Sequence, residues 1–169
     1  ALPISYFYIE EIEIRNIKKA AVDLYSVADN TTVRNMTISN SGFGINVTSD
    51  RNTITGNNIS NLKMIKNTPD IQGDDYGAVA VNLDGGDAGI TGNIISYNTF
   101  RNCEAPSYDY GTDGGGVEFY KKISNTTVRH NRVEDSAMFA EMGGTGQSET
   151  SNYIYRNLSI NNGQFLIFH

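Results

Sequence analysis

Short apolar alternations recur along this chain and define a repeating unit. Each unit begins with two apolar residues that stand five positions apart, with polar residues including asparagine between them. Runs of alternating apolar residues follow the pairs, as in Phe43-Gly-Ile45-Asn-Val47. Because side chains along a strand point alternately to opposite faces, these runs predict very short strands with one buried face. The pairs are Ile12/Ile17, Val33/Ile38, Ile54/Ile59, Ile95/Phe100, Val128/Val133 and Tyr155/Ile160.

The spacing of these pairs predicts a coil of stacked strands. Their first members are 21, 21, 41, 33 and 27 residues apart, so a 21-residue unit repeats and later units carry insertions. A helical solenoid would need a period of 3.6 residues sustained over ten or more positions, and the sequence shows none. The insertions fall at residues 61–76, 102–116 and 143–152.

Asparagine is unusually frequent, with 20 residues in a chain of 169. Asn57, Asn98 and Asn131 occupy one position of the repeat, and Asn35 and Asn157 fall one residue earlier. Asparagine tolerates the left-handed backbone conformation that sharp bends require. If the units stack, these side chains align, so we expect a ladder of amide hydrogen bonds beside a continuous apolar core.

The repeated phrases resemble a known superfamily. Asn52-Thr-Ile-Thr-Gly-Asn-Asn-Ile59 and Asn125-Thr-Thr-Val-Arg-His-Asn-Arg-Val133 are similar to the rungs of right-handed parallel β-helix, or pectate-lyase-like, proteins. The resemblance implies an all-β fold, a right-handed parallel β-helix of about six rungs, with residues 1–169 as one domain. We expect a fragment of a longer protein or a partner-capped stack, because both ends read as strand without a capping helix. End-to-end self-association is a further expectation.

The insertions indicate where a site would lie. In a solenoid, insertions become loops and neighbouring loops build the site. We expect the loops at 61–76 and 102–116 to be neighbours on one edge, with the loop at 143–152 on another. Between them, a groove with an acidic floor is expected. Its outward residues would be Asn82, Asp84, Glu118, Tyr120, Phe139 and Glu141.

The charge pattern supports this location. The net charge is −6, which disfavours binding to nucleic-acid phosphates. The stretch from Asp70 to Glu118 holds nine acidic residues and one base, a net −8. Ordinary solvated turns explain such residues as readily as a calcium site or catalytic acids do. The calcium ligands would be Asp74, Asp75, Asp84 and Asp113.

The segment from Asp113 to Tyr120 contains the catalytic candidates, Asp113 and Glu118, and Glu141 lies in the next unit. If Val117 stacks on Ala140, the two glutamates lie one rung apart, and the pKa of one of them rises as a general acid requires. If Phe119 stacks on Ala140 instead, Tyr120 lies beside Glu141 and there is no pair.

Aromatic and basic residues near the expected groove are candidates for binding sugar. Tyrosine combines an apolar face with a hydrogen-bonding edge, which suits sugar rings, although loop packing against the sheet explains these residues slightly better. His130 and His169 are given no role. The candidates are Tyr108, Tyr110, Tyr120 and Arg101.

Two classes of function remain open. The first is an extracellular or cell-surface enzyme acting on polysaccharide, either a lyase or a glycoside hydrolase. The resemblance implies a Lys or Arg base and often calcium for a lyase. The second is a non-catalytic adhesion or sugar-binding scaffold. The apolar runs are too short to span a membrane, and the single cysteine, Cys103, excludes a disulfide framework.

Overall fold

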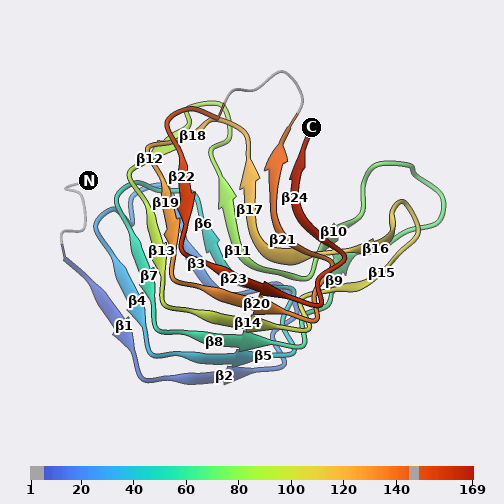
Figure 1. Cartoon of the computed structure of the whole chain (residues 1–169), viewed down its shortest axis with the longest axis horizontal. Coiled ribbons are helices and arrows are strands. Elements are labelled where there is room, and N and C mark those ends of the chain that lie inside the picture. The colour runs from blue at the N-terminus through green and yellow to red at the C-terminus, as the bar shows by residue number, and fades with distance from the viewer. Residues whose placement is uncertain (1–5, 145–148) are drawn as a thin grey trace.

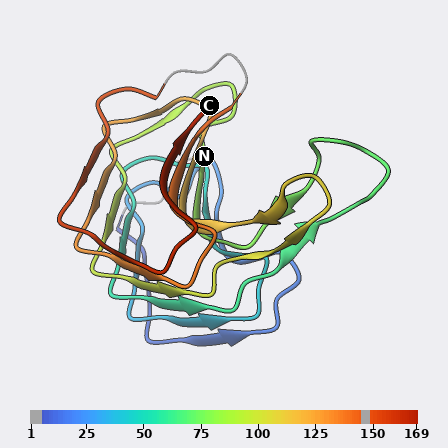
Figure 2. The same ribbon diagram turned by 45° about the vertical axis from the view of Figure 1, so that its right-hand side comes forward.

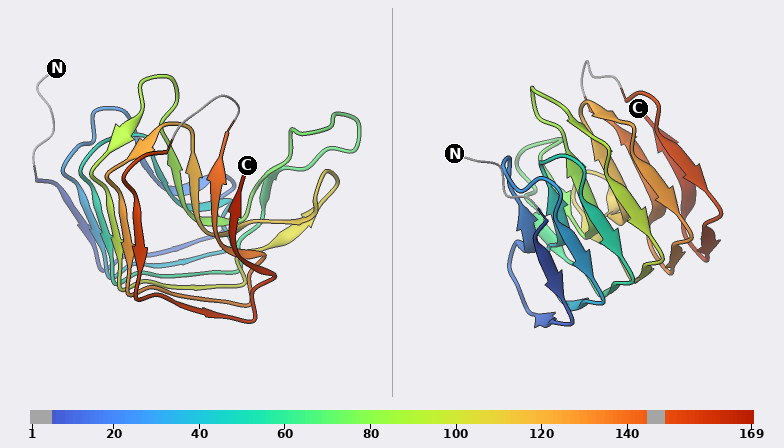
Figure 3. Two further views of the ribbon diagram at one scale, coloured as in Figure 1. Left: turned by 45° about the horizontal axis from the view of Figure 1, so that its top comes forward. Right: turned by 90° about the vertical axis from the view of Figure 1, so that its left-hand side faces the viewer.

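The computed structural model describes residues 6–144 and 149–169. These residues form a coil in which three parallel sheets of six strands each run side by side (Figure 1). Each turn of the coil, here called a rung, gives one strand to each sheet, so the coil has six rungs. The predicted all-β parallel β-helix of about six rungs is confirmed. Figure 3 shows the rungs stacked in order from the N-terminal to the C-terminal end.

The three sheets are built as follows. Sheet A consists of β1 (Tyr8–Glu10), β4 (Thr32–Arg34), β7 (Thr53–Thr55), β13 (Ile94–Ser96), β19 (Thr127–Arg129) and β22 (Tyr153–Tyr155). Sheet B consists of β2 (Glu13–Arg15), β5 (Thr37–Ser39), β8 (Asn58–Ser60), β14 (Thr99–Arg101), β20 (Arg132–Glu134) and β23 (Leu158–Ile160). Sheet C consists of β3 (Ala20–Leu24), β6 (Phe43–Val47), β11 (Val79–Asp84), β17 (Gly115–Tyr120), β21 (Met138–Gly143) and β24 (Gln164–Phe168).

Two hairpins project from the coil on one side, as Figure 2 shows. They are β9 (Met64–Lys66) with β10 (Tyr76–Gly77), and β15 (Ala105–Ser107) with β16 (Gly111–Asp113). The amide group of Asn67 joins them, since its Nδ2 donates to the carbonyl of Pro106 at 2.9 Å and its Oδ1 accepts from the backbone of Tyr108 at 3.0 Å. The expectation that insertions 61–76 and 102–116 are neighbours is confirmed. A short parallel pair, β12 (Ile90–Thr91) and β18 (Ile123–Ser124), completes the strands of the described residues.

The core is a column of apolar side chains from successive rungs. In the three-residue strands of sheets A and B, the middle residue points inward, as Ile54 and Phe100 do with no exposed surface. Sheet C adds inward residues such as Val81 and Phe119. Each therefore packs on the equivalent residue of the next rung, so burial depends on stacking and not on any single rung.

The predicted register was wrong in the two end rungs. Val33 pairs with Ile9 rather than with Ile12, and Val128 pairs with Ile154 rather than with Tyr155. Tyr155 points outward and is 43% exposed. In the first rung, Ile9 and Ile14 fit the same five-residue spacing as the predicted pair. In the last rung, the residue opposite Val133 is the polar Ser159, which a search for apolar pairs misses.

The predicted asparagine ladder is present. The Oδ1 of Asn57 accepts from the backbone of Met36, that of Asn98 accepts from the backbone of Asn57, and that of Asn131 accepts from the backbone of Asn98, at 2.9–3.0 Å. Asn157 continues the ladder at 2.9 Å from the backbone of Asn131. The side chain of Asn35 does not belong to it, because Met36 occupies that position.

A second ladder was not predicted. Asn52 accepts from the backbone of Thr31 at 2.9 Å, and Asn93 accepts from the backbone of Asn52 at 2.8 Å. Both asparagines have no exposed surface. These ladders satisfy backbone groups at the bends, where no strand partner is available.

Phe139 was expected on the outer face of sheet C, and that expectation was wrong. Its side chain is fully buried in the core and lies 5.0 Å from the ring of Phe165. Gly116 is its neighbour in the preceding rung, and a Cβ on Gly116 would come within 2.7 Å of the backbone oxygen of Phe139. The strands of sheet C bend at this position, so strict alternation of inward and outward residues fails there.

Gly44 sits in the same crowded column, and its replacement tests the packing. A Cβ on Gly44 would lie 2.5 Å from the oxygen of Ala80 and 2.7 Å from the Cγ2 of Ile59. Gly44→Ala is therefore expected to lower the free energy of unfolding by about 1–3 kcal/mol, measured by urea denaturation. An unchanged unfolding midpoint would show that the rungs can move apart to admit the methyl group at little cost in free energy.

Both end rungs expose large apolar side chains. Tyr6 and Phe7 are 77% and 54% exposed in the first rung, and Phe165 and Phe168 are 52% and 71% exposed in the last. These surfaces are compatible with end-to-end self-association, which stays a prediction.

Candidate functional site

Glu118 and Glu141 lie side by side on the outer face of sheet C. Strands β17 and β21 pair so that Val117 is opposite Ala140 and Glu118 is opposite Glu141. Val117 and Ala140 are buried, which turns both glutamates outward. Of the two registers that the sequence left open, the structure has the one that forms the pair. Neighbouring strands lie about 4.8 Å apart, which sets the scale of the separation.

A row of polar side chains leads to this pair from the N-terminal rungs. Asn46 donates to Asp23 at 2.9 Å, and Asn82 donates to Asn46 at 2.7 Å. Asn82 is opposite Glu118 in the next strand. Within the described part of the chain, no group donates a hydrogen bond to the Glu118 carboxyl, so the chain of hydrogen bonds stops one residue short of it.

This environment favours the protonated form of Glu118. Burial raises the pKa of Glu118 to about 8, and the negative charges of Glu141, Asp113 and Asp84 act in the same direction. A carboxyl with this pKa holds its proton in most molecules at pH 7. Glu118 thus has the protonation state of a general acid.

Asp113 borders the pair from the hairpin β15–β16. Burial raises its pKa to about 6, a hydrogen bond from the Gly114 amide at 2.7 Å opposes this, and the charges of Glu141 and Asp75 add to it. Three predicted catalytic residues, Asp113, Glu118 and Glu141, are therefore close enough to influence one another electrostatically.

His169 also reaches the site, a contact that the sequence analysis did not predict. Its Nε2 lies 2.9 Å from the Oε1 of Glu141. The pairing of β21 with β24 sets Phe168 opposite Met142, and Gly143 leaves room for the imidazole because a Cβ there would lie 2.8 Å from that of His169. Only the register of the last rung, which the sequence pattern misplaced, would have revealed this contact.

The predicted tyrosines differ in their relation to the pair. Tyr110 is influenced by the charge of Glu141. Its pKa is raised by burial and then by the charges of Asp109, Asp113 and Glu141. Tyr120 follows Glu118 on β17, with the Lys121 Nζ 4.6 Å from its ring centre. Tyr108 lies at the tip of its hairpin and is 67% exposed.

Arg101 does not share this face. It lies at the end of β14 in sheet B, where its guanidinium forms an ion pair with Glu134. Arg132 binds the other oxygen of the same carboxylate. The structure thus separates Arg101 from Glu118 and Glu141.

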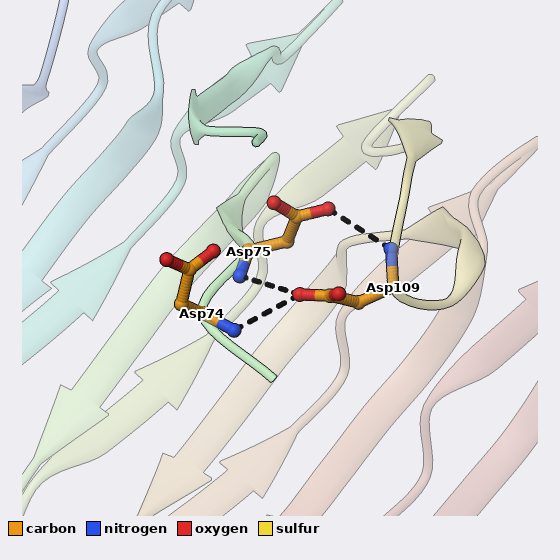
Figure 4. A group of neighbouring side chains, drawn as sticks. All are labelled: Asp74, Asp75 and Asp109. Atoms are coloured by element: carbon orange, nitrogen blue, oxygen red, sulfur yellow. Dashed lines mark hydrogen bonds between the residues drawn. The ribbon is translucent and has the colours of Figure 1, made fainter. Parts of the chain in front are cut away.

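A cluster of three aspartates holds the two hairpins together (Figure 4). The Oδ2 of Asp109 accepts from the backbone amides of Asp74 and Asp75, both at 2.9 Å. The Oδ2 of Asp75 accepts in return from the Asp109 amide at 3.1 Å. Asp74 forms an ion pair with Lys66. These carboxylates act as hydrogen-bond acceptors that pin one loop to the other.

The four predicted calcium ligands do not form a single cluster. Asp74 and Asp75 come together with Asp109, each offering an oxygen within 4.8 Å of the others. Asp109 was not among the predicted ligands, while Asp84 and Asp113 lie outside this group. Calcium binding stays a prediction.

Asp75 is expected to be the main link between the hairpins. Burial opposes its ionisation, but hydrogen bonds from the Ser107 hydroxyl and from the Thr68 and Asp109 amides outweigh burial and lower its pKa. Asp75→Asn, which loses one acceptor oxygen, should speed amide exchange at Thr68 and Asp109 about tenfold or more. Hydrogen exchange measured by NMR checks this.

The same link has a defined pH dependence. Because the pKa of Asp75 is lower in the folded protein, its stabilisation is complete above the unfolded value of about 3.9 and disappears as the pH falls through the folded value. Asp70→Asn is the matched control, since Asp70 is an exposed residue of the same loop. Equal exchange rates in both variants would contradict the role of Asp75.

Two hollows lie on the coil, and neither is lined by Glu118 or Glu141. One, of about 370 Å³, is lined by Met142, Leu166 and His169 among others. The other, of about 500 Å³, is lined by Asp84, Gly86 and further residues of the N-terminal rungs. Both glutamates are half-buried. The predicted loop at 143–152 falls partly on residues 145–148, which lie outside the described residues.

Comparison with known proteins identifies the family. The family model of the right-handed β-helix region matches residues 4–162. The chain matches neither a curated protein nor a solved structure. Among the described residues there is no helix of the length and apolarity needed to cross a membrane. This fold is common among carbohydrate-active enzymes, although a fold does not by itself fix an activity. Since the match covers nearly all of its residues, the chain belongs to the right-handed β-helix family.

Proposed function

We propose that the protein is a glycoside hydrolase that cleaves a polysaccharide on the outer face of sheet C. Glu118 is the general acid, and Glu141 is the carboxylate nucleophile. The observation that carries this proposal is the in-register pair in unequal environments. Glu118 has a pKa of about 8, while Glu141 interacts with His169 at 2.9 Å. Two carboxyl groups with separate roles are what glycoside hydrolysis requires.

The reaction follows from these roles. Glu118 gives its proton to the glycosidic oxygen as the bond from that oxygen to the anomeric carbon breaks. Glu141 attacks the anomeric carbon and forms a glycosyl ester, which water then hydrolyses while Glu118 takes a proton back. The strand spacing of about 4.8 Å favours this double displacement, because an inverting enzyme needs its carboxyls further apart to admit a water molecule. We therefore propose that the configuration at the anomeric carbon is retained.

The charges around the pair favour a neutral glycan. Asp84, Asp113 and Glu141 surround Glu118 closely enough to raise its pKa, and the same charges repel an acidic polymer. A polymeric substrate supports an extracellular or cell-surface location for the enzyme.

The test is product analysis on a panel of neutral and acidic polysaccharides. Proton NMR should show new reducing ends from a neutral polymer. The first reducing ends to appear should have the same anomeric configuration as the bond that was cleaved. Unsaturated uronate ends, detected by ultraviolet absorbance, would instead identify a lyase. Binding of a polymer without any cleavage would favour the non-catalytic scaffold.

A further inference from the structure

A separate cluster of aromatic and basic side chains lies at the corner where sheet A turns into sheet B. We call this cluster the aromatic corner and define it as Tyr97, Arg129, His130, Tyr155 and Arg156. The turns that carry it join β13 to β14, β19 to β20 and β22 to β23, along one long edge of the coil (Figures 1 and 3). It lies on other sheets than the glutamate pair.

The corner consists of two adjoining columns, one of three residues and one of two, set by the rungs. Tyr97, His130 and Arg156 follow one another in the turns, since the Tyr97 amide donates to the carbonyl of Arg129 and the His130 amide to that of Arg156. Arg129 and Tyr155 are opposite each other in the adjoining column of sheet A. Each column therefore contains both aromatic and guanidinium groups.

The rings are ordered by contacts with one another. Those of Tyr97 and His130 are parallel to within 2°, with centres 4.8 Å apart, and Tyr155 meets His130 edge-on at 6.3 Å. The Cζ of Arg129 lies 5.7 Å from the ring centre of Tyr97. Tyr97 and Tyr155 are nonetheless 58% and 43% exposed.

The two arginines of the corner stand apart from the other arginines. Arg15, Arg34, Arg51, Arg101 and Arg132 each form an ion pair with a carboxylate. Arg129 and Arg156 form none with any described residue, and residues 1–5 and 145–148 contain no Asp or Glu. In a chain with 19 acidic and 13 basic residues, two neighbouring unpaired arginines leave a local positive charge with no protein counterpart.

We propose that the aromatic corner binds an anionic saccharide, a sugar ring bearing carboxylate or sulfate groups. The exposed tyrosine faces receive the apolar face of the ring, and Arg129 and Arg156 hold the anionic groups through charge-assisted hydrogen bonds. Single-stranded nucleic acid uses similar side chains, but it needs many phosphates neutralised, and the protein carries a net −6. The site is independent of the proposed hydrolase reaction.

Arg34 provides a matched control for these arginines. It occupies the same outward column of sheet A as Arg129, linked to it through Thr55 and Ser96. Its Cζ also lies over a tyrosine, 5.4 Å from the ring centre of Tyr8, but its guanidinium is paired with Glu10. Arg34 thus differs from Arg129 chiefly in having a carboxylate partner.

Calorimetric titration of the full chain tests the proposal with four probes: an oligo-uronate, its carboxyl-reduced neutral form, a sulfated oligosaccharide and a single-stranded oligonucleotide. An anionic saccharide should bind about tenfold or more tightly than the neutral form, and Arg129→Gln or Arg156→Gln should each weaken it about fivefold to tenfold. Arg34→Gln and Glu118→Gln should leave the affinity unchanged, which keeps this result separate from the hydrolase proposal.

Four results would overturn the proposal. The first two are no binding of either anionic saccharide and equal affinity for the neutral form. The other two are a loss of affinity in Arg34→Gln equal to that in the Arg129 and Arg156 variants, and tighter binding of the oligonucleotide than of the saccharides. Thermal melting of each variant confirms that the fold is intact before titration. Arg156 is exposed and Arg129 is half-buried, and neither forms an ion pair with a described residue, so neither variant should unfold.

Discussion

Glu118→Gln is expected to lower the rate of glycan hydrolysis by about 10²–10⁴-fold, because glutamine keeps the size of the side chain but has no acidic proton for the leaving oxygen. In the wild-type protein the rate should fall as the pH rises through the Glu118 pKa of about 8. Initial rates measured over a range of pH check both expectations.

The control is Glu104→Gln, an exposed glutamate in the inserted segment 102–116. It should hydrolyse at the wild-type rate. A wild-type rate in Glu118→Gln would remove Glu118 from the reaction and leave the hydrolase proposal without its acid.

The stability of the same variant distinguishes lost chemistry from lost structure. The pKa of Glu118 is higher in the folded protein than the unfolded value of about 4.3, so wild-type stability is complete below that value and declines up to about pH 8. Glutamine does not ionise. Glu118→Gln should therefore melt at a higher temperature than wild type at pH 8, with the difference vanishing near pH 4.

Asn98→Ala is expected to lower the free energy of unfolding by about 3–5 kcal/mol, because it leaves several buried polar groups without partners. The Oδ1 of Asn98 accepts from the amide and the side chain of Asn57, both at 2.9 Å. Its Nδ2 donates to the carbonyl of Ile54 at 3.0 Å and to the side chain of Asn131 at 2.9 Å. Urea unfolding measures the loss.

Asn58→Ala is the matched control for the ladder. Asn58 is an exposed residue of β8 in the preceding rung, so its replacement should change stability by no more than about 0.5 kcal/mol. A similar small effect in Asn98→Ala would mean that the ladder follows from the stacking of the rungs and does not stabilise it.

The architecture was predictable because every rung repeats the same pattern of apolar and polar residues. Pairs such as Val33/Ile38 and Ile54/Ile59 specify an inward residue on two sheets, and the stacking of identical rungs fixes the rest. The pattern failed where neighbouring apolar residues compete for one position, as Ile154 and Tyr155 do. It also failed at Phe139, because a bend in the strand turns an expected outward side chain into the core.

The site was predictable only in part, for a physical reason. Loops 61–76 and 102–116 could be placed side by side because rungs stack in order, and the register between Glu118 and Glu141 could be narrowed to two choices. Contacts between irregular segments follow no period. Asp109 joins the aspartate cluster through such a contact, so the repeat pattern did not indicate it. His169 was missed for a different reason, because its contact with Glu141 follows from the register of the last rung, which the pattern misplaced.

The central claim is that Glu118 stays protonated at neutral pH beside Glu141. Carbon NMR titration of the glutamate carboxyl groups tests it most directly, with the Glu118→Gln spectrum supplying the assignment. The account predicts a midpoint near 8 for the signal that this variant loses. A midpoint near the ordinary glutamate value of about 4.3 would contradict it, since Glu118 would then be ionised at pH 7 and would have no proton to donate.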